Sequence, residues 1–165
     1  MEVAMNRALA PLIAAALGTF LMTSALVAVP ATLGAAGACT ISGTSGPDRL
    51  EGTSGRDVIC GKGGADRIDA KGGNDTVLGG GGNDDIMGGG GIDTLNGGPG
   101  RDFMIGGLGA DKLLGGGGNE RCLLAFGGGA DRVDGGPGRD RYRADGSDTI
   151  VSAEVSVVVC PPFPP

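Results

Sequence analysis

Single apolar residues recur along this chain at every ninth position, separated by segments rich in Gly and polar residues. They are Leu50, Ile59, Ile68, Val77, Ile86, Leu95, Met104, Leu113 and Cys122. A run such as Asp75-Thr76-Val77-Leu78 suits only a very short strand whose central side chain points inward. The pattern therefore predicts an array of short strands, each of which contributes one side chain to a narrow core.

Two further residue types keep the same period. An acidic residue precedes each apolar residue by two positions: Asp48, Asp57, Asp66, Asp75, Asp84, Asp93, Asp102, Asp111 and Glu120. A Gly precedes each acidic residue by two positions. Gly at this point permits positive φ and lets the chain reverse direction between strands. We therefore expect two repeats to complete one coil, so that each repeat stacks on the next but one.

The clearest repeats are GGGGNDDIM (79–87), GGGGIDTLN (88–96), GGPGRDFMI (97–105) and GGLGADKLL (106–114). They resemble the nonapeptide GGxGxDxUx of the RTX, or haemolysin-type, calcium-binding proteins. The resemblance extends from Gly43 to about Val151, with a register slip of two residues after Leu123. It implies an all-β fold, a parallel β-roll (β-solenoid) with two repeats in each coil.

The stacked turns offer ligands for a hard cation, because Ca²⁺ takes carboxylate and carbonyl oxygens. We expect ions between acidic residues 18 positions apart, about six ions or more in total. One edge would carry Asp48, Asp66, Asp84 and Asp102, and the other Asp57, Asp75, Asp93 and Asp111. The extra methylene of Glu120 displaces its carboxylate from this row. Asp131 and Asp140 face opposite edges, and the register slip leaves their partners open.

Residues 1–38 differ in composition from the array. Arg7 precedes a long apolar run and small residues follow, which predicts a secretory signal peptide cleaved after Ala31 or Ala38. The run is also long enough to span a membrane, so a retained anchor is one alternative. A lipoprotein acylated at Cys39 is another. We expect the roll to occupy residues 39–151, followed by a capping strand and a Pro-rich tail at 152–165.

Four Cys residues in a secreted chain indicate two disulfides, for which three pairings exist. We favour Cys39–Cys60 and Cys122–Cys160, because each would fix one end of the roll. Cys60 should face outward. Cys122 occupies an inward position, where an unpaired, buried thiol is the alternative.

Composition narrows the functional classes. The chain has 37 Gly, one Tyr, no Trp and no His, with a net charge of −6. The lack of His removes the usual general base and zinc ligand. Only the leader and a short tail lie outside the array, so we expect no enzyme and no catalytic residues. Nucleic acid binding is not indicated, because the Arg residues are scattered among acidic ones. A flexible Gly-rich linker would not keep apolar residues at a fixed repeat position.

One outward-facing surface is a candidate partner site. The seventh and ninth repeat positions on one sheet include Met87, Phe103, Ile105 and Leu123. A contiguous exposed apolar surface can mark an interface with a protein or cell-surface partner. Coverage of this surface by the C-terminal tail is the alternative.

These features predict a secreted, extracellular calcium-binding repeat protein, with no membrane attachment once the leader is cleaved. Its thin core and stacked carboxylates should leave it disordered without calcium. Calcium would fold the roll, which then acts as a structural or interaction module. The alternative is a cell-surface adhesin or matrix component that uses the same roll.

Overall fold

The computed structural model describes residues 38–152 and 155–156. All of them belong to the second of the two units into which the chain divides, Gly34–Pro165. The predicted signal peptide, apart from its last residue, and residues 157–165 of the predicted tail lie outside the described residues. Within the described ranges, no helix is long and apolar enough to span a membrane.

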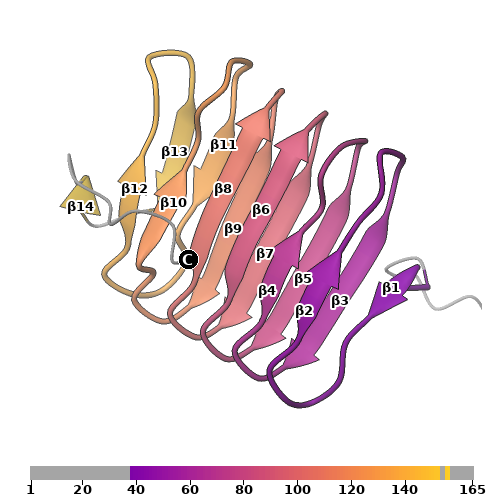
Figure 1. Ribbon diagram of the computed structural model, residues 1–165. Coiled ribbons are helices and arrows are strands. Elements are labelled where there is room, and N and C mark those ends of the chain that lie inside the picture. Colours follow the sequence, from indigo (N-terminus) through magenta and orange to yellow (C-terminus); the bar gives the residue numbers. More distant parts are fainter. Residues whose placement is uncertain (1–37, 153–154, 157–165) are drawn as a thin grey trace, which may run out of the picture. The chain divides into compact units, whose positions relative to one another are not determined.

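The described chain winds through short strands that alternate between two sheets (Figure 1). The odd sheet consists of β1 (Ile41–Ser42), β3 (Val58–Gly63), β5 (Thr76–Gly81), β7 (Thr94–Pro99), β9 (Lys112–Gly117), β11 (Arg132–Asp134) and β13 (Thr149–Ser152). The even sheet consists of β2 (Arg49–Glu51), β4 (Arg67–Asp69), β6 (Asp85–Gly90), β8 (Phe103–Leu108), β10 (Cys122–Leu124), β12 (Arg141–Arg143) and β14 (Val155–Ser156).

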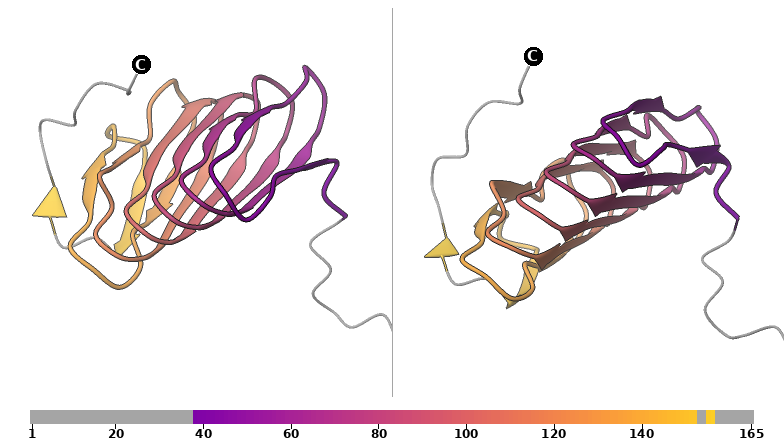
Figure 2. Two further views of the ribbon diagram at one scale, coloured as in Figure 1. Left: turned by 60° about the horizontal axis from the view of Figure 1, so that its bottom comes forward. Right: turned by 90° about the horizontal axis from the view of Figure 1, so that it is seen from below.

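Each strand pairs in parallel with the next but one in the sequence. Val77 lies beside Leu95 in the odd sheet, and Ile86 lies beside Met104 in the even sheet, 18 residues apart in both cases. The two sheets face each other and are joined by turns along both edges (Figure 2). The predicted parallel β-roll with two repeats in each coil is therefore confirmed.

The core between the sheets is one side chain deep on each strand. Its large apolar members, all at most 1% exposed, are Ile59, Ile68, Val77, Ile86, Leu95, Met104, Leu113, Leu123 and Val133. Most are the central residues of the strand runs found in the sequence. Burial of each such side chain stabilises the fold by about 1.5–3 kcal/mol.

The turns use positive φ at two positions of the repeat. The predicted position, the fourth, is illustrated by Gly82 with φ 133°. The second position also has positive φ, as at Gly80 with φ 106°. Lys62 and Lys71 occupy this second position with φ of 79° and 71°, a conformation that costs a side-chain-bearing residue about 1–2 kcal/mol.

A bulge interrupts the 18-residue register at the start of β10. The Arg121 N–H donates to the Asp102 carbonyl at 2.8 Å, yet it is Cys122 that pairs with Phe103. Arg121 and Cys122 thus oppose a single residue, as in a β-bulge. A shift of one residue exchanges the two faces of a strand. The predictions that Cys122 points inward and Leu123 outward are therefore wrong, because Leu123 aligns with Met104 and joins the core.

A disulfide joins Cys39 to Cys60 at the N-terminal end of the roll, with a Cα–Cα distance of 5.9 Å. Cys60 is 7% exposed. Cys122 is also disulfide-bonded, so the alternative of an unpaired thiol is wrong. Its predicted partner, Cys160, lies outside the described residues.

Candidate metal sites

Acidic side chains stack in two columns, one in the turns that lead into the even strands and one in the turns that lead into the odd strands. The even column contains Asp48, Asp66, Asp84, Asp102, Glu120 and Asp140. The odd column contains Asp57, Asp75, Asp93, Asp111, Asp131 and Asp148. Along each column, the backbone N–H of one acidic residue donates to Oδ1 of the acidic residue on the next coil, at 2.7–3.2 Å. The step from Asp102 to Glu120 is the exception.

The second carboxylate oxygen has no hydrogen-bond partner in most of these turns. This applies to Oδ2 of Asp66, Asp75, Asp84, Asp93, Asp102, Asp111 and Asp140, and to both oxygens of Glu120. All eight side chains are at most 2% exposed. A buried carboxylate oxygen without a partner is strongly unfavourable unless a cation or a proton satisfies it.

The backbone completes a cradle of oxygens around these carboxylates. A Cβ on Gly79 would lie 2.5 Å from Asp84 Oδ2 and 2.7 Å from the Gly97 carbonyl oxygen. A Cβ on Gly88 would lie 2.6 Å from Asp93 Oδ2 and 2.5 Å from the Gly106 carbonyl oxygen. A carboxylate oxygen and a carbonyl oxygen from the next coil therefore meet beside the first Gly of each of these repeats. Any larger residue at that position would place its Cβ against the two oxygens.

The donor set fits Ca²⁺, which prefers several oxygen ligands drawn from carboxylates and carbonyls. Within residues 38–152, no three acidic or Cys side chains converge on one point. A cation in these turns must therefore take backbone carbonyls as part of its ligand set. This is the arrangement that the sequence predicts for two stacked turns.

Burial raises the pKa of the stacked acidic residues. The pKa reaches about 6 for Asp111 and about 7 for Asp102. The pKa is also raised for Asp66, Asp75, Asp84, Asp93 and Asp131. The N–H from the preceding coil opposes the shift, and the neighbouring carboxylates add to it. The folded columns thus disfavour negative charge unless a cation compensates it.

The two N-terminal turns differ from the rest. Asp48 Oδ2 accepts hydrogen bonds from the Thr44 N–H at 2.6 Å and the Thr44 hydroxyl at 2.9 Å. Asp57 Oδ2 accepts the same pair from Thr53 at 2.7 and 2.9 Å, which lowers the pKa of Asp57. The signal in the sequence is Thr in place of Gly at the second repeat position.

Pairs with an unpartnered oxygen on both members are therefore 66/84, 84/102, 102/120 and 120/140 in the even column, and 75/93 and 93/111 in the odd column.

The structure also resolves the partners that the register slip left open. Asp111 donates its N–H to Asp131 at 2.7 Å, and Glu120 donates its N–H to Asp140 at 3.2 Å, both across 20 residues. Asp148 was not among the predicted ligands, although its Oδ1 accepts the Asp131 N–H at 3.0 Å. It precedes Ile150 by two positions, which is the spacing that identified the other acidic residues.

The predicted apolar surface on the even sheet differs from expectation. Phe103 and Leu123 are fully buried, and Met87 and Ile105 are half-buried. The Arg121 guanidinium lies 5.6 Å from the Phe103 ring centroid. Because the bulge turns Leu123 inward, these four residues do not form the contiguous exposed patch predicted from the sequence.

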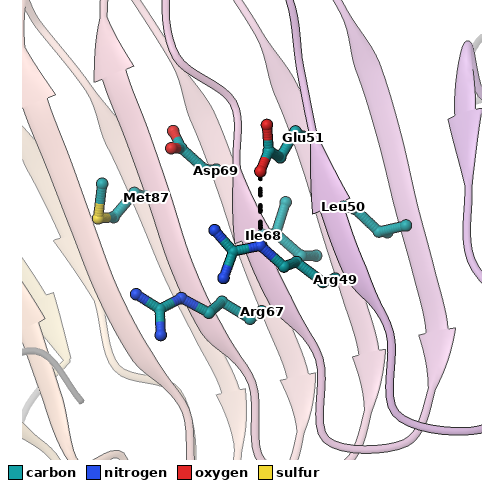
Figure 3. Close-up of a pocket in the computed structure, with 7 residues that line it drawn as sticks. All are labelled: Arg49, Leu50, Glu51, Arg67, Ile68, Asp69 and Met87. Atoms are coloured by element: carbon teal, nitrogen blue, oxygen red, sulfur yellow. Dashed lines mark hydrogen bonds and ion pairs between the residues drawn. The ribbon is translucent and has the colours of Figure 1, made fainter. Parts of the chain in front are cut away.

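A pocket on the even sheet brings Met87 together with charged side chains (Figure 3). Its lining residues are Arg49, Leu50, Glu51, Arg67, Ile68, Asp69 and Met87. Glu51 pairs with Arg49 at 3.4 Å and with Lys71 at 3.0 Å. The pocket is therefore lined by charged side chains of both signs together with Leu50, Ile68 and Met87.

A protein-family model described as RTX calcium-binding nonapeptide repeat (4 copies) matches the chain several times. The matched residues are 34–68, 42–77, 61–95, 87–120 and 127–142, which together cover well over half of the sequence. No curated protein and no solved structure matches the chain.

Proposed function

Because this chain belongs to the RTX calcium-binding nonapeptide repeat family, we propose that it is a secreted calcium-binding protein whose roll folds when its turns bind Ca²⁺. It acts as a structural or interaction module and not as an enzyme. The observation that carries this proposal is the repetition of buried, unpartnered Oδ2 atoms in two columns. Bound Ca²⁺ would supply the positive charge that these oxygens lack.

The chain's own residues explain why folding and binding are coupled. The unfolded chain leaves each carboxylate in water, whereas the folded chain buries it beside another carboxylate 18 residues away. The core offers only one apolar side chain on each strand to offset this penalty. Ligand that binds the folded state alone stabilises it by RT ln(1 + [L]/Kd) at each site. Extracellular calcium modules bind in the range of about 10⁻⁴–10⁻³ M, so the roll would fold outside the cell.

A calcium titration of the oxidised chain, followed by far-ultraviolet circular dichroism, tests this function. We expect a cooperative transition from coil to β-structure near millimolar Ca²⁺ and none with Mg²⁺, which dehydrates reluctantly and demands octahedral geometry. A chain that is fully folded in chelator, or one that stays unfolded at high calcium, would refute the proposal.

Two charge-matched variants sharpen the titration. Asp93→Asn removes one unpartnered oxygen from the two pairs that Asp93 forms, one with Asp75 and one with Asp111. Glu51→Gln removes the same charge from the outer face of β2, where Glu51 contacts Arg49 and Lys71. Loss of one site at tenfold excess of calcium over its Kd lowers stability by about 1.4 kcal/mol. We expect this loss and a higher calcium midpoint for Asp93→Asn only.

Export is tested separately by recovering the chain from the culture medium and reading its N-terminus by mass spectrometry. Cleavage after Ala31 or Ala38 would support the signal peptide. Retention on washed cells would instead favour the adhesin or matrix role.

A further inference from the structure

Glu120 is the one acidic residue of the two columns that is not Asp, and it stands directly before the β10 bulge. It remains in the even column, where its N–H donates to Asp140 Oδ1 at 3.2 Å. Its side chain is 1% exposed, and that of Asp140 is 0% exposed. Glu at this position therefore places a longer side chain inside the column, and its carboxylate stays buried there.

The Glu120 turn holds more unpartnered oxygens than a regular turn. In a regular turn such as that of Asp84, Oδ1 accepts an N–H from the preceding coil and only Oδ2 lacks a partner. Both Glu120 oxygens lack a partner, and Asp140 Oδ2 lacks one as well. Three such oxygens thus belong to two residues that are adjacent in the column, compared with two for the pair Asp66 and Asp84.

The longer side chain also moves the carboxylate. A Cβ on Gly115 would lie 3.0 Å from both Cγ and Cδ of Glu120 and would also contact the Gly135 carbonyl oxygen. In the regular turn at Gly88, the nearest side-chain atom is a carboxylate oxygen, Asp93 Oδ2, at 2.6 Å. Carbon atoms of Glu120 therefore stand close to the place where Asp presents its oxygen, and the Glu120 carboxylate extends beyond it.

Glu120 and Asp140 lie on adjacent coils of the even column, joined by the hydrogen bond from the Glu120 N–H to Asp140 Oδ1. Two buried carboxyl groups on adjacent coils, with three oxygens that have no hydrogen-bond partner, are a site that a cation would stabilise.

We propose that Glu120 and Asp140 form a calcium site of a second kind, in which both Glu120 oxygens, Asp140 Oδ2 and the Gly135 carbonyl hold one ion. This inference rests on the proposed calcium function and adds a local exception to it. A bidentate Glu is a recognised way to complete an oxygen shell around Ca²⁺. The Glu120–Asp140 pair has the same charge as a regular Asp–Asp pair but offers the ion one more unpartnered carboxylate oxygen. The site therefore binds more tightly than the regular turns.

The chain contains a reporter for this site. Tyr142 is its only Tyr, there is no Trp, and Tyr142 lies in β12 two residues after Asp140. That separation is about 7 Å along a strand. Tb³⁺ accepts the same oxygen ligands and emits when a nearby Tyr is excited, so Tyr-sensitised emission reports on ions close to Asp140. The experiment titrates Tb³⁺ into the oxidised full chain and then displaces it with Ca²⁺.

Glu120→Gln and Glu120→Asp are compared with the outer-face control Glu51→Gln. Loss of one charged oxygen ligand should raise the Tb³⁺ midpoint of Glu120→Gln by about tenfold or more. Glu120→Asp restores the residue typical of the family, and it should nevertheless raise the Tb³⁺ midpoint by about fivefold, because it removes the bidentate reach. Glu51→Gln should match the wild type.

The direction in which Glu120→Asp shifts the Tb³⁺ midpoint tests the second kind of site even if Glu120→Gln fails to fold. An unchanged or tighter Tb³⁺ midpoint in Glu120→Asp overturns the proposal, because it would make Glu120 a degraded regular position. Circular dichroism of the wild type separates this result from failure of the general function. If calcium still folds the wild type while the Glu120 variants bind Tb³⁺ normally, only the second kind of site is lost.

Discussion

Each regular acidic residue in the roll uses its two oxygens for different purposes. Oδ1 of Asp84 accepts the N–H of Asp66 and so joins neighbouring coils, whereas Oδ2 lacks a partner and faces the Gly79 cradle. Asn could retain the first role, because its carbonyl oxygen accepts a hydrogen bond, but it would lose the second. Substitution of Asp by Asn therefore separates the contribution of coil stacking from that of cation binding.

Lys62 offers a test of backbone strain at a single residue. It adopts φ 79° at the second repeat position, where Lys71 follows in the next repeat and most later repeats have Gly. Lys62→Gly removes a conformational cost of about 1–2 kcal/mol, offset by the extra freedom of Gly in the unfolded chain, about 0.5–1 kcal/mol. We expect a net gain of about 0.5–1 kcal/mol in the free energy of unfolding, measured by urea denaturation in saturating calcium.

The matched control is Lys112→Gly on β9, where Lys112 does not have positive φ. Gly in a strand at negative φ lowers stability by about 0.5–1 kcal/mol, so the two substitutions should have opposite signs. Equal signs would show that positive φ is not what distinguishes Lys62.

At the scale of elements, the β10 bulge decides which side chains enter the core. Leu123 is fully buried beside Met104, whereas its neighbour Leu124 is only half-buried. Leu123→Ala should lower the free energy of unfolding by about 2–4 kcal/mol, because it removes a buried side chain and leaves a cavity. Leu124→Ala should cost less than about 1 kcal/mol. Calcium-saturated denaturation curves of the two variants measure the difference, and the reverse order would place the bulge elsewhere.

The regular strands were predictable because every repeat between Asp48 and Leu113 has the same length. Constant length fixes which residue points inward, so Ile59 and Leu95 could be assigned to the core from spacing alone. The slip after this region was visible in the sequence, but its placement was not. One extra residue enters at Arg121, ahead of the strand, and Leu123 therefore replaces Cys122 on the inner face. Either register buries an apolar residue, so hydrophobicity could not choose between them.

The acidic columns were predictable from the same spacing, but the bonding of each oxygen was not. Asp48 and Asp57 match the repeat, yet hydrogen bonds from Thr44 and Thr53 occupy their Oδ2 atoms. Such local bonds depend on how a turn folds back on itself and not on the period. Asp148 was missed for the opposite reason, because its repeat is shortened and lacks the usual Gly pair.

At the scale of the whole molecule, the columns make stability depend on pH in opposite ways with and without calcium. Burial raises the pKa of Asp111 to about 6, of Asp102 to about 7 and of Glu120 to about 8, above ordinary values near 4. Groups with a raised folded-state pKa stabilise the fold fully below their unfolded pKa, and this contribution is lost as pH rises through the folded value. In chelator, the roll should therefore be more stable at pH 5 than at pH 8.

With calcium present the trend reverses, because the ion requires ionised carboxylates and competes with protons. The calcium midpoint should rise as the pH falls from 8 to 5. Circular dichroism at several pH values, in chelator and in calcium, measures both trends. Greater stability at pH 8 than at pH 5 in chelator would contradict the raised pKa values.

Consecutive repeats alternate between the odd and even sheets. The number of repeats that precede a strand, odd or even, therefore decides to which sheet that strand belongs. Removal of 18 residues, such as 79–96, would take out one coil and return every later strand to its own sheet. Removal of nine would send every later strand to the opposite sheet, and Cys122 would then share a sheet with Cys60. Regular repeats can thus be gained or lost in pairs without changing which surface carries which side chains. An odd change would move every downstream strand to the opposite sheet, together with the disulfide at Cys122.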